Sequence, residues 1–221
     1  MAYIYAVPPW FCGYDALVEV IFAVMTLLVG VYSYKIYKLT AHRASHLFSL
    51  GFFSIAISYI ILALYNFLLL TEMNQKICAI ANISNVTLFT NSQMYLHLFF
   101  YLIGLMILLY ITLKVPCKRV FSLLGLLVFI SFVFTLHNPF GAYILSTVLL
   151  AYIFWYYMNN YLSRPILSKQ LVMIGFGMLL GANILFIFSF DYGAYYIIAH
   201  IIKFIAYSII LINLIVLLRR K

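Results

Sequence analysis

Long apolar stretches alternate with short polar segments along this chain, and the apolar stretches carry almost no charge. A helix that crosses a lipid bilayer needs roughly 17–25 mainly apolar residues. Seven segments meet this requirement: Leu17–Ile36, Leu47–Leu70, Gln93–Leu113, Val120–Leu136, Ala142–Met158, Leu171–Phe190 and Tyr195–Leu218. All five prolines fall outside these segments, so none interrupts a helix. The pattern predicts an all-α, polytopic membrane protein with seven transmembrane helices.

Composition excludes the soluble classes. Hydrophobic residues make up 67% of the 221 residues, and charged residues make up 8%. Soluble domains are typically about 45–50% apolar and about 25% charged. An outer-membrane barrel would alternate polar and apolar residues along each strand, whereas the apolar segments of this chain are continuous. A helical membrane protein is the class that remains.

Basic residues gather at alternate ends of the predicted helices. Eleven of the thirteen Lys and Arg residues lie on one side: Lys35, Lys38, Arg43, Lys114, Lys118, Arg119, Arg164, Lys169, Arg219, Arg220 and Lys221. The other side holds Lys76 and all four acidic residues, Asp15, Glu19, Glu72 and Asp191. Cytoplasmic loops carry the excess of Lys and Arg, so we expect the N-terminus outside the plasma membrane and the C-terminus in the cytoplasm. This topology accounts for the formal net charge of +9, and no nucleic-acid partner is expected.

The spacing of the helices predicts one domain over residues 1–221 with a 3+1+3 pseudo-repeat. The repeat units cover residues 17–113 and 142–218, and the helix at 120–136 links them. An offset of 124 residues places Gly51 and Phe52 of the second helix on Gly175 and Phe176 of the sixth. Two three-helix units joined by one further helix run parallel, which is an arrangement known among transporters.

This layout is similar to that of the sugar-transporting SWEET family, which has an outside N-terminus, seven helices and a 3+1+3 repeat. The resemblance implies a transport function. The first and fifth helices lack that family's Pro-Gln-type motif because they contain no proline, so the likeness is one of topology and no functional residue carries over. The segments Tyr34–Thr40 and Leu50–Phe52 also resemble small uncharacterised multi-pass membrane proteins of archaea, which imply no activity.

Ionisable side chains inside the predicted spans are candidates for function, because charge is costly in hydrocarbon. Glu19 of the first helix, His97 of the third, and His200 and Lys203 of the seventh all lie in the outer half of the membrane. Asn66 of the second helix and Asn183 of the sixth add amides in the outer half. We expect Glu19 to pair with Lys203, directly or through water, or else Lys203 to be uncharged.

Three functions remain open for this set of residues. The first is the binding or transport of a small polar or anionic solute through an outward-facing pocket lined by Glu19, His97, Asn183, His200 and Lys203. The second is a sensor or complex subunit in which the polar cluster joins the helices. The third is an electron carrier in which His97 and His200 ligate haem b. The sequence contains no GxSxG, HExxH or Walker motif, so we expect no enzymatic activity.

The outer loop predicted at Thr71–Ser92 contains two acceptor sequons, at Asn82 and Asn85. Cys12 and Cys78 are both expected outside, where a disulfide bond between them could persist. The alternative for this pair is two free thiols.

Gly177 and Gly181 form a GxxxG motif in the sixth helix. We expect it to serve packing within the bundle rather than a homodimer, which is the alternative.

Overall fold

Seven helices account for nearly all of the structure, a computed structural model that describes residues 14–73, 83–114, 118–135, 140–189 and 193–219. The side chains of residues 68–73, 83–93, 118 and 134–135 are outside this description. The helices are α1 (Tyr14–Thr40), α2 (Arg43–Met73), α3 (Ile83–Leu113), α4 (Lys118–Thr135), α5 (Phe140–Ser163), α6 (Leu167–Phe188) and α7 (Gly193–Arg219). The all-α class and each predicted helix are confirmed.

The segment between α2 and α3 is shorter than predicted. α2 continues to Met73 and α3 begins at Ile83, so the predicted loop Thr71–Ser92 is wrong at both ends. Residues 83–92 are rich in Asn, Ser and Thr, but they contain no glycine or proline that would stop a helix. Asn85 therefore lies in the first turn of α3, and its backbone is helical. Asn82, Cys12 and Cys78 lie outside the described residues.

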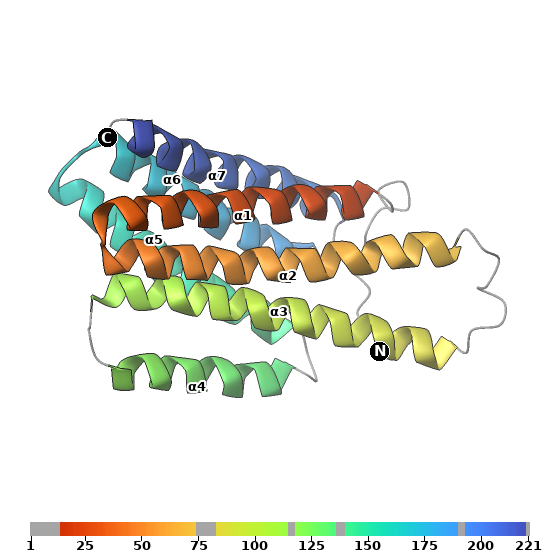
Figure 1. The fold of residues 1–221 in the computed structure, drawn as a ribbon. Helices are drawn as coiled ribbons and strands as arrows, with labels where there is room; N and C mark the ends of the chain where they lie inside the picture. The colour runs from red at the N-terminus through yellow and green to blue at the C-terminus, as the bar shows by residue number, and fades with distance from the viewer. Residues whose placement is uncertain (1–13, 74–82, 115–117, 136–139, 190–192, 220–221) are drawn as a thin grey trace.

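Six helices enclose the core in a closed ring. Contacts join α1 to α2, α2 to α3, α3 to α5, α5 to α6, α6 to α7, and α7 back to α1. α4 lies outside this ring, where it contacts α3 and α5, and Figure 1 shows it beside α3 at the edge of the bundle. The fully buried side chains inside the ring include Phe22, Phe52, Leu102, Phe176 and Tyr207.

Consecutive helices run in opposite directions (Figure 1). We call the end where α1, α3, α5 and α7 begin the N-side end, and the opposite end the C-side end. In the orientation predicted from charge, the N-side end faces outward.

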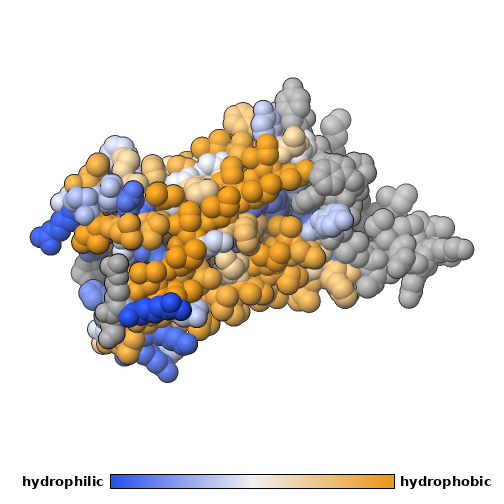
Figure 2. Space-filling view, turned by 90° about the horizontal axis from the view of Figure 1, so that it is seen from above, coloured by the Kyte–Doolittle hydropathy of each residue, from blue (hydrophilic) through white to orange (hydrophobic). Residues whose placement is uncertain are grey.

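The bundle has the length and surface of a multi-pass membrane protein. All six ring helices are long and apolar enough to cross a membrane, while α4 is a shorter apolar helix. At 18 residues α4 is about 27 Å long, close to the roughly 30 Å of bilayer hydrocarbon. Its outer side exposes large apolar residues, including Leu123, Leu126 and Phe129. Figure 2 shows apolar residues over the flank of the bundle and hydrophilic residues gathered at one end.

Glycines let neighbouring helices approach closely in both halves of the ring. A Cβ on Gly104 of α3 would lie 2.5 Å from Ile55 Cγ1 and 2.8 Å from the carbonyl oxygen of Gly51 in α2. In the second half, a Cβ on Gly175 of α6 would lie 2.6 Å from Ile210 Cγ1 of α7. These positions require glycine because the facing helix occupies the space of a side chain.

The GxxxG motif serves packing inside the bundle at one of its two positions. A Cβ on Gly177 would lie 2.9 Å from the ring of Phe154 in α5, whereas a Cβ on Gly181 would meet no atom of the described residues within 4 Å. Packing within the bundle is thus confirmed for Gly177. The homodimer remains untested.

A two-residue turn joins α1 to α2 at the C-side end. Ala41 adopts a left-handed conformation with φ of 53°, and its amide donates to Tyr37 O at 2.7 Å. Serine hydroxyl groups then join the two helices, because Ser33 donates to Ser45 O at 3.0 Å and Ser49 donates to Gly30 O at 2.8 Å. The turn and these bonds fix the register of α1 against α2.

Candidate functional site

A carboxylate of α1 and two side chains of α7 meet near the N-side end. The hydroxyl group of Tyr196 lies 2.8 Å from both carboxylate oxygens of Asp15, to which it donates. His200 Nε2 lies 3.6 Å from Asp15 Oδ1, and its Nδ1 lies 2.9 Å from the backbone oxygen of Tyr196. Tyr196 and His200 are four residues apart, so they share one face of α7. Polar contacts thus connect α1 with α7 at this end.

Glu19 lies one turn deeper in α1 and is bound by an amide of α2. Its side chain is 2% exposed, and Asn66 Nδ2 donates to Glu19 Oε2 at 2.7 Å. The predicted direct ion pair with Lys203 is wrong, because the described residues place no carboxylate within 4 Å of Lys203 Nζ. The reason is that Lys203 turns toward α6, where its ammonium group meets an aromatic ring. Contact with Glu19 through water remains a prediction.

Aromatic rings surround the Lys203 ammonium group. Its Nζ lies 4.0 Å from the ring centroid of Phe186, 5.8 Å from that of Tyr101 and 6.0 Å from that of Tyr59. Lys203 is 7% exposed. A cation within about 6 Å of a ring face is attracted by the ring's electrons. These contacts orient the ammonium group, but they provide no negative charge that would neutralise it.

His97 belongs to the same cluster. Its Nδ1 lies 3.1 Å from the backbone oxygen of Ser58 in α2, and its ring stacks on Tyr101 at a centroid distance of 6.0 Å. Tyr59 lies 5.5 Å from the His97 ring and joins its hydroxyl group to that of Tyr207 at 3.2 Å. His97 and Lys203 therefore share Tyr59 and Tyr101 as neighbours.

Asn183, by contrast, bonds to α5. Its Nδ2 donates to Ser146 Oγ at 2.7 Å, Thr147 Oγ1 at 2.8 Å and Tyr143 O at 3.2 Å, all in α5. The structure thus brings together Glu19, His97, His200 and Lys203, and it places the Asn183 amide nitrogen in the contact between α5 and α6.

The sequence prediction missed several members of the cluster. Asp15 and Tyr196 stand four residues before Glu19 and His200, so helical spacing places each pair on one face and could have identified them. Asn66, the amide partner of Glu19, was identified from the sequence as an amide in the outer half of the second helix but was not included in the predicted site. The rings of Tyr59 and Phe186 gave no such signal, because aromatic residues occur throughout the spans.

The space between His97 and His200 is occupied by other side chains. A chain of rings joins the two imidazoles, with centroid distances of 5.5 Å from His97 to Tyr59, 5.3 Å from Tyr59 to Phe22 and 5.7 Å from Phe22 to His200. A porphyrin ligated by both histidines needs the space that Phe22 and Tyr59 fill. The residues present therefore do not fit a bis-histidine haem.

Comparisons with protein-family models, with curated proteins and with solved structures find no match for this chain.

Proposed function

We propose that this multi-pass membrane protein binds and transports a small polar or anionic solute at the polar cluster of Asp15, Glu19, His97, His200 and Lys203. The observation that carries the proposal is the buried Lys203 ammonium group, which has three aromatic neighbours and no carboxylate within 4 Å among the described residues. An ionisable group inside a membrane span is a candidate for function, since holding it there is costly. A negatively charged solute would provide the missing counter-charge.

The groups around Lys203 suit a small solute with polar substituents. The Tyr59 and Tyr207 hydroxyl groups are buried beside it and bond to each other, so they are available to exchange that bond for one to a solute. The rings of Phe186 and Tyr101 provide apolar walls. Ligand sites commonly combine such walls with a few convergent polar groups.

Access is proposed from the N-side end, between α1 and α7. Asp15, Tyr196 and His200 lie there, one or two turns above Lys203. In the orientation that the Lys and Arg distribution predicts, this end faces the outside of the cell membrane.

The contacts within the two halves of the ring support transport rather than binding alone. Gly51 of α2 faces Leu108 of α3, and Gly175 of α6 faces Ile210 of α7. Leu108 and Ile210 are 102 residues apart in the sequence, and so are Gly104 and Ala206. The carbonyl oxygen of Ala206 lies 3.5 Å from the Cβ position of Gly175. The second and third helices of the proposed repeat units thus pack in the same register, which supports a parallel repeat of the kind known among transporters.

A thermal-shift screen of the purified chain tests the proposal. The panel contains small carboxylates, sulfate, phosphate and neutral sugars, and it is run on the parent, on Lys203→Met and on the control Lys169→Met. Lys169 lies at the C-side end, where its Nζ donates to Asn160 O at 3.2 Å. We expect an anionic solute to raise the melting temperature of the parent and the control but not of Lys203→Met. A shift that persists in Lys203→Met would contradict the proposal.

The second candidate is a membrane sensor or complex subunit in which this cluster is structural. Hydrogen bonds between helices favour it, because Asn66 joins α2 to α1 and Tyr196 joins α7 to α1. On this hypothesis no solute in the panel shifts the melting temperature of the parent.

A further inference from the structure

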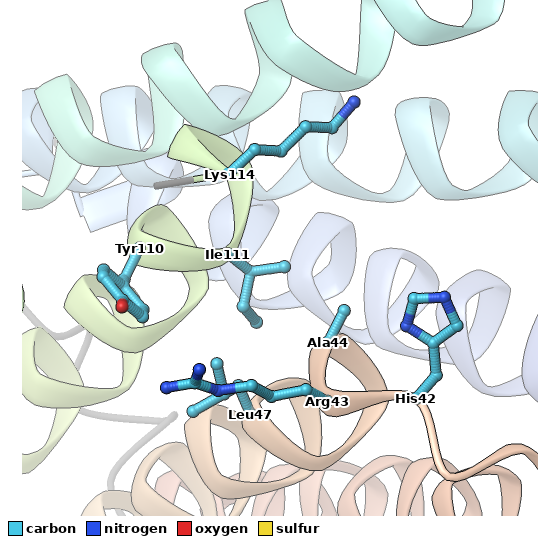
Figure 3. A pocket seen from close by; sticks show the side chains of 7 residues that line it. All are labelled: His42, Arg43, Ala44, Leu47, Tyr110, Ile111 and Lys114. Atoms are coloured by element: carbon cyan, nitrogen blue, oxygen red, sulfur yellow. The ribbon is translucent and has the colours of Figure 1, made fainter. Parts of the chain in front are cut away.

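A pocket with basic side chains opens at the C-side end, far from the cluster around Lys203. It lies between the start of α2 and the end of α3 and has a volume of about 220 Å³. Figure 3 shows its lining, which α2 and the residue before it supply from one side and α3 and the residue after it from the other: His42, Arg43, Ala44, Leu47, Tyr110, Ile111 and Lys114. The pocket is wide enough for several water molecules.

The basic side chains of this pocket have no carboxylate partner among the described residues, although Lys114 Nζ lies over the ring of Tyr156 in α5, 5.4 Å from its centroid. Asp15 and Glu19 lie in the first turns of α1, and Glu72 lies in the last turn of α2, so all three belong to the N-side end. The fourth acidic residue, Asp191, follows α6 in the sequence and precedes α7. Among the described residues, none provides an anion that balances the charge of Arg43.

Backbone geometry adds to this preference for an anion. α2 begins at Arg43, and the first amides that bond within the turn are those of Ser45 and His46, both to His42 O. The start of a helix carries partial positive charge from its free amide groups. Lys114, with a left-handed φ of 52°, follows α3 and lines the same pocket, and its ammonium group extends away from Arg43 (Figure 3).

Apolar side chains extend from the pocket along the flank of the bundle. Leu47 and Ile111 form part of its wall. Leu50, Ile57 and Leu64 follow at intervals of seven residues, two helical turns each, and they are 42%, 43% and 60% exposed. The pocket is therefore continuous with an apolar strip of α2 that faces the lipid.

We propose that this pocket binds the phosphate headgroup of an anionic phospholipid, whose acyl chain lies along the apolar strip of α2. Both the headgroup and the acyl chain are needed to match this surface. A soluble anion would leave the apolar strip uncovered, and a zwitterionic lipid would bring a cation to a basic pocket. In the predicted orientation the pocket faces the cytoplasmic leaflet, where anionic lipids attract basic segments. This site is independent of the proposed solute site.

Native mass spectrometry of the full chain in detergent tests this site, with phosphatidylglycerol and phosphatidylcholine as probes. The test variant is the double substitution Arg43→Gln/Lys114→Gln. The matched control is Lys38→Gln/Arg164→Gln, which removes the same charge from exposed positions at the same end but outside the pocket. A hydrogen bond to a charged group contributes roughly tenfold or more to affinity, so the test variant, which loses its contacts with the headgroup, should bind phosphatidylglycerol at least about tenfold more weakly than the parent.

We expect the control variant to bind phosphatidylglycerol as the parent does, and phosphatidylcholine to bind more weakly to the parent. Equal loss of affinity in the test and control variants would overturn the proposal, because charge at this end would then act without the pocket. Equal binding of the two lipids by the parent would also overturn it. So would displacement of the lipid by an equal concentration of inorganic phosphate, which would identify a site for free anions.

Discussion

Substituting Gly104 by alanine tests how closely α2 and α3 are packed. The new methyl group would lie 2.5 Å from Ile55 Cγ1 and 2.8 Å from the carbonyl oxygen of Gly51. The Ile55 side chain can rotate, but the backbone oxygen moves only if the two helices separate. Overpacking of this kind costs about 1–3 kcal/mol, and alanine returns about 1 kcal/mol through its higher helix propensity. We expect Gly104→Ala to lower the free energy of unfolding by up to about 2 kcal/mol.

Gly181→Ala is the matched control, because a Cβ at Gly181 meets no atom within 4 Å among the described residues. It should be stabilised by about 1 kcal/mol through helix propensity alone. The two variants should thus differ by about 1–3 kcal/mol, or roughly 2–12 °C in melting temperature. Thermal unfolding of both proteins in the same detergent measures this difference. Equal melting temperatures would refute the close approach of α2 and α3.

Three further substitutions test single contacts by the same assay. Ala41→Gly should raise the melting temperature, because glycine removes the strain of about 1 kcal/mol that a Cβ causes at this left-handed position. Asn66→Leu should destabilise the protein by about 2 kcal/mol, since Glu19 loses its amide donor in a buried site. Tyr196→Phe should cost a similar amount, about 2 kcal/mol, because its hydroxyl group donates to both oxygens of Asp15.

Ser208→Ala is a control for the last two substitutions. Ser208 is half-buried, and among the described residues its hydroxyl group donates to Phe204 O in its own helix. We expect its melting temperature to stay close to that of the parent. If Asn66→Leu and Tyr196→Phe were equally silent, the hydrogen bonds between helices at the N-side end would contribute nothing to stability.

The positions of the helices could be predicted because hydrophobic length alone defines a span. Apolar runs bounded by basic residues and prolines gave six of the seven helices to within a few residues of the ends observed. α3 was the exception, since its first turns are polar. Residues 83–92 look like a loop in composition, yet they form helix because they contain no glycine or proline.

The sequence predicted most of the ionisable side chains of the candidate site, but not which neighbours each side chain contacts. Counting residues along each helix predicted the outer half of the membrane for Glu19, His97, His200 and Lys203, and in the structure His97 and Lys203 share Tyr59 and Tyr101 as neighbours. The partner of each group depends on how its helix is rotated and on which neighbour lies nearest. Glu19 therefore bonds to Asn66 rather than to Lys203, and Lys203 meets Phe186. No pattern in the sequence specifies these rotations.

The position of α4 outside the ring makes the two junctions between the halves unequal. Because α4 contacts both α3 and α5, it covers the junction between these two helices. Separating α3 from α5 would also disrupt the contacts of α4. The other junction, between α7 and α1, is not covered by a further helix among those described. Its polar contacts are those of Asp15 with Tyr196 and His200. Among the described helices, the junction between α1 and α7 is thus the one held together by polar contacts without a covering helix. A change of protonation or of bound charge at Asp15 would alter these contacts.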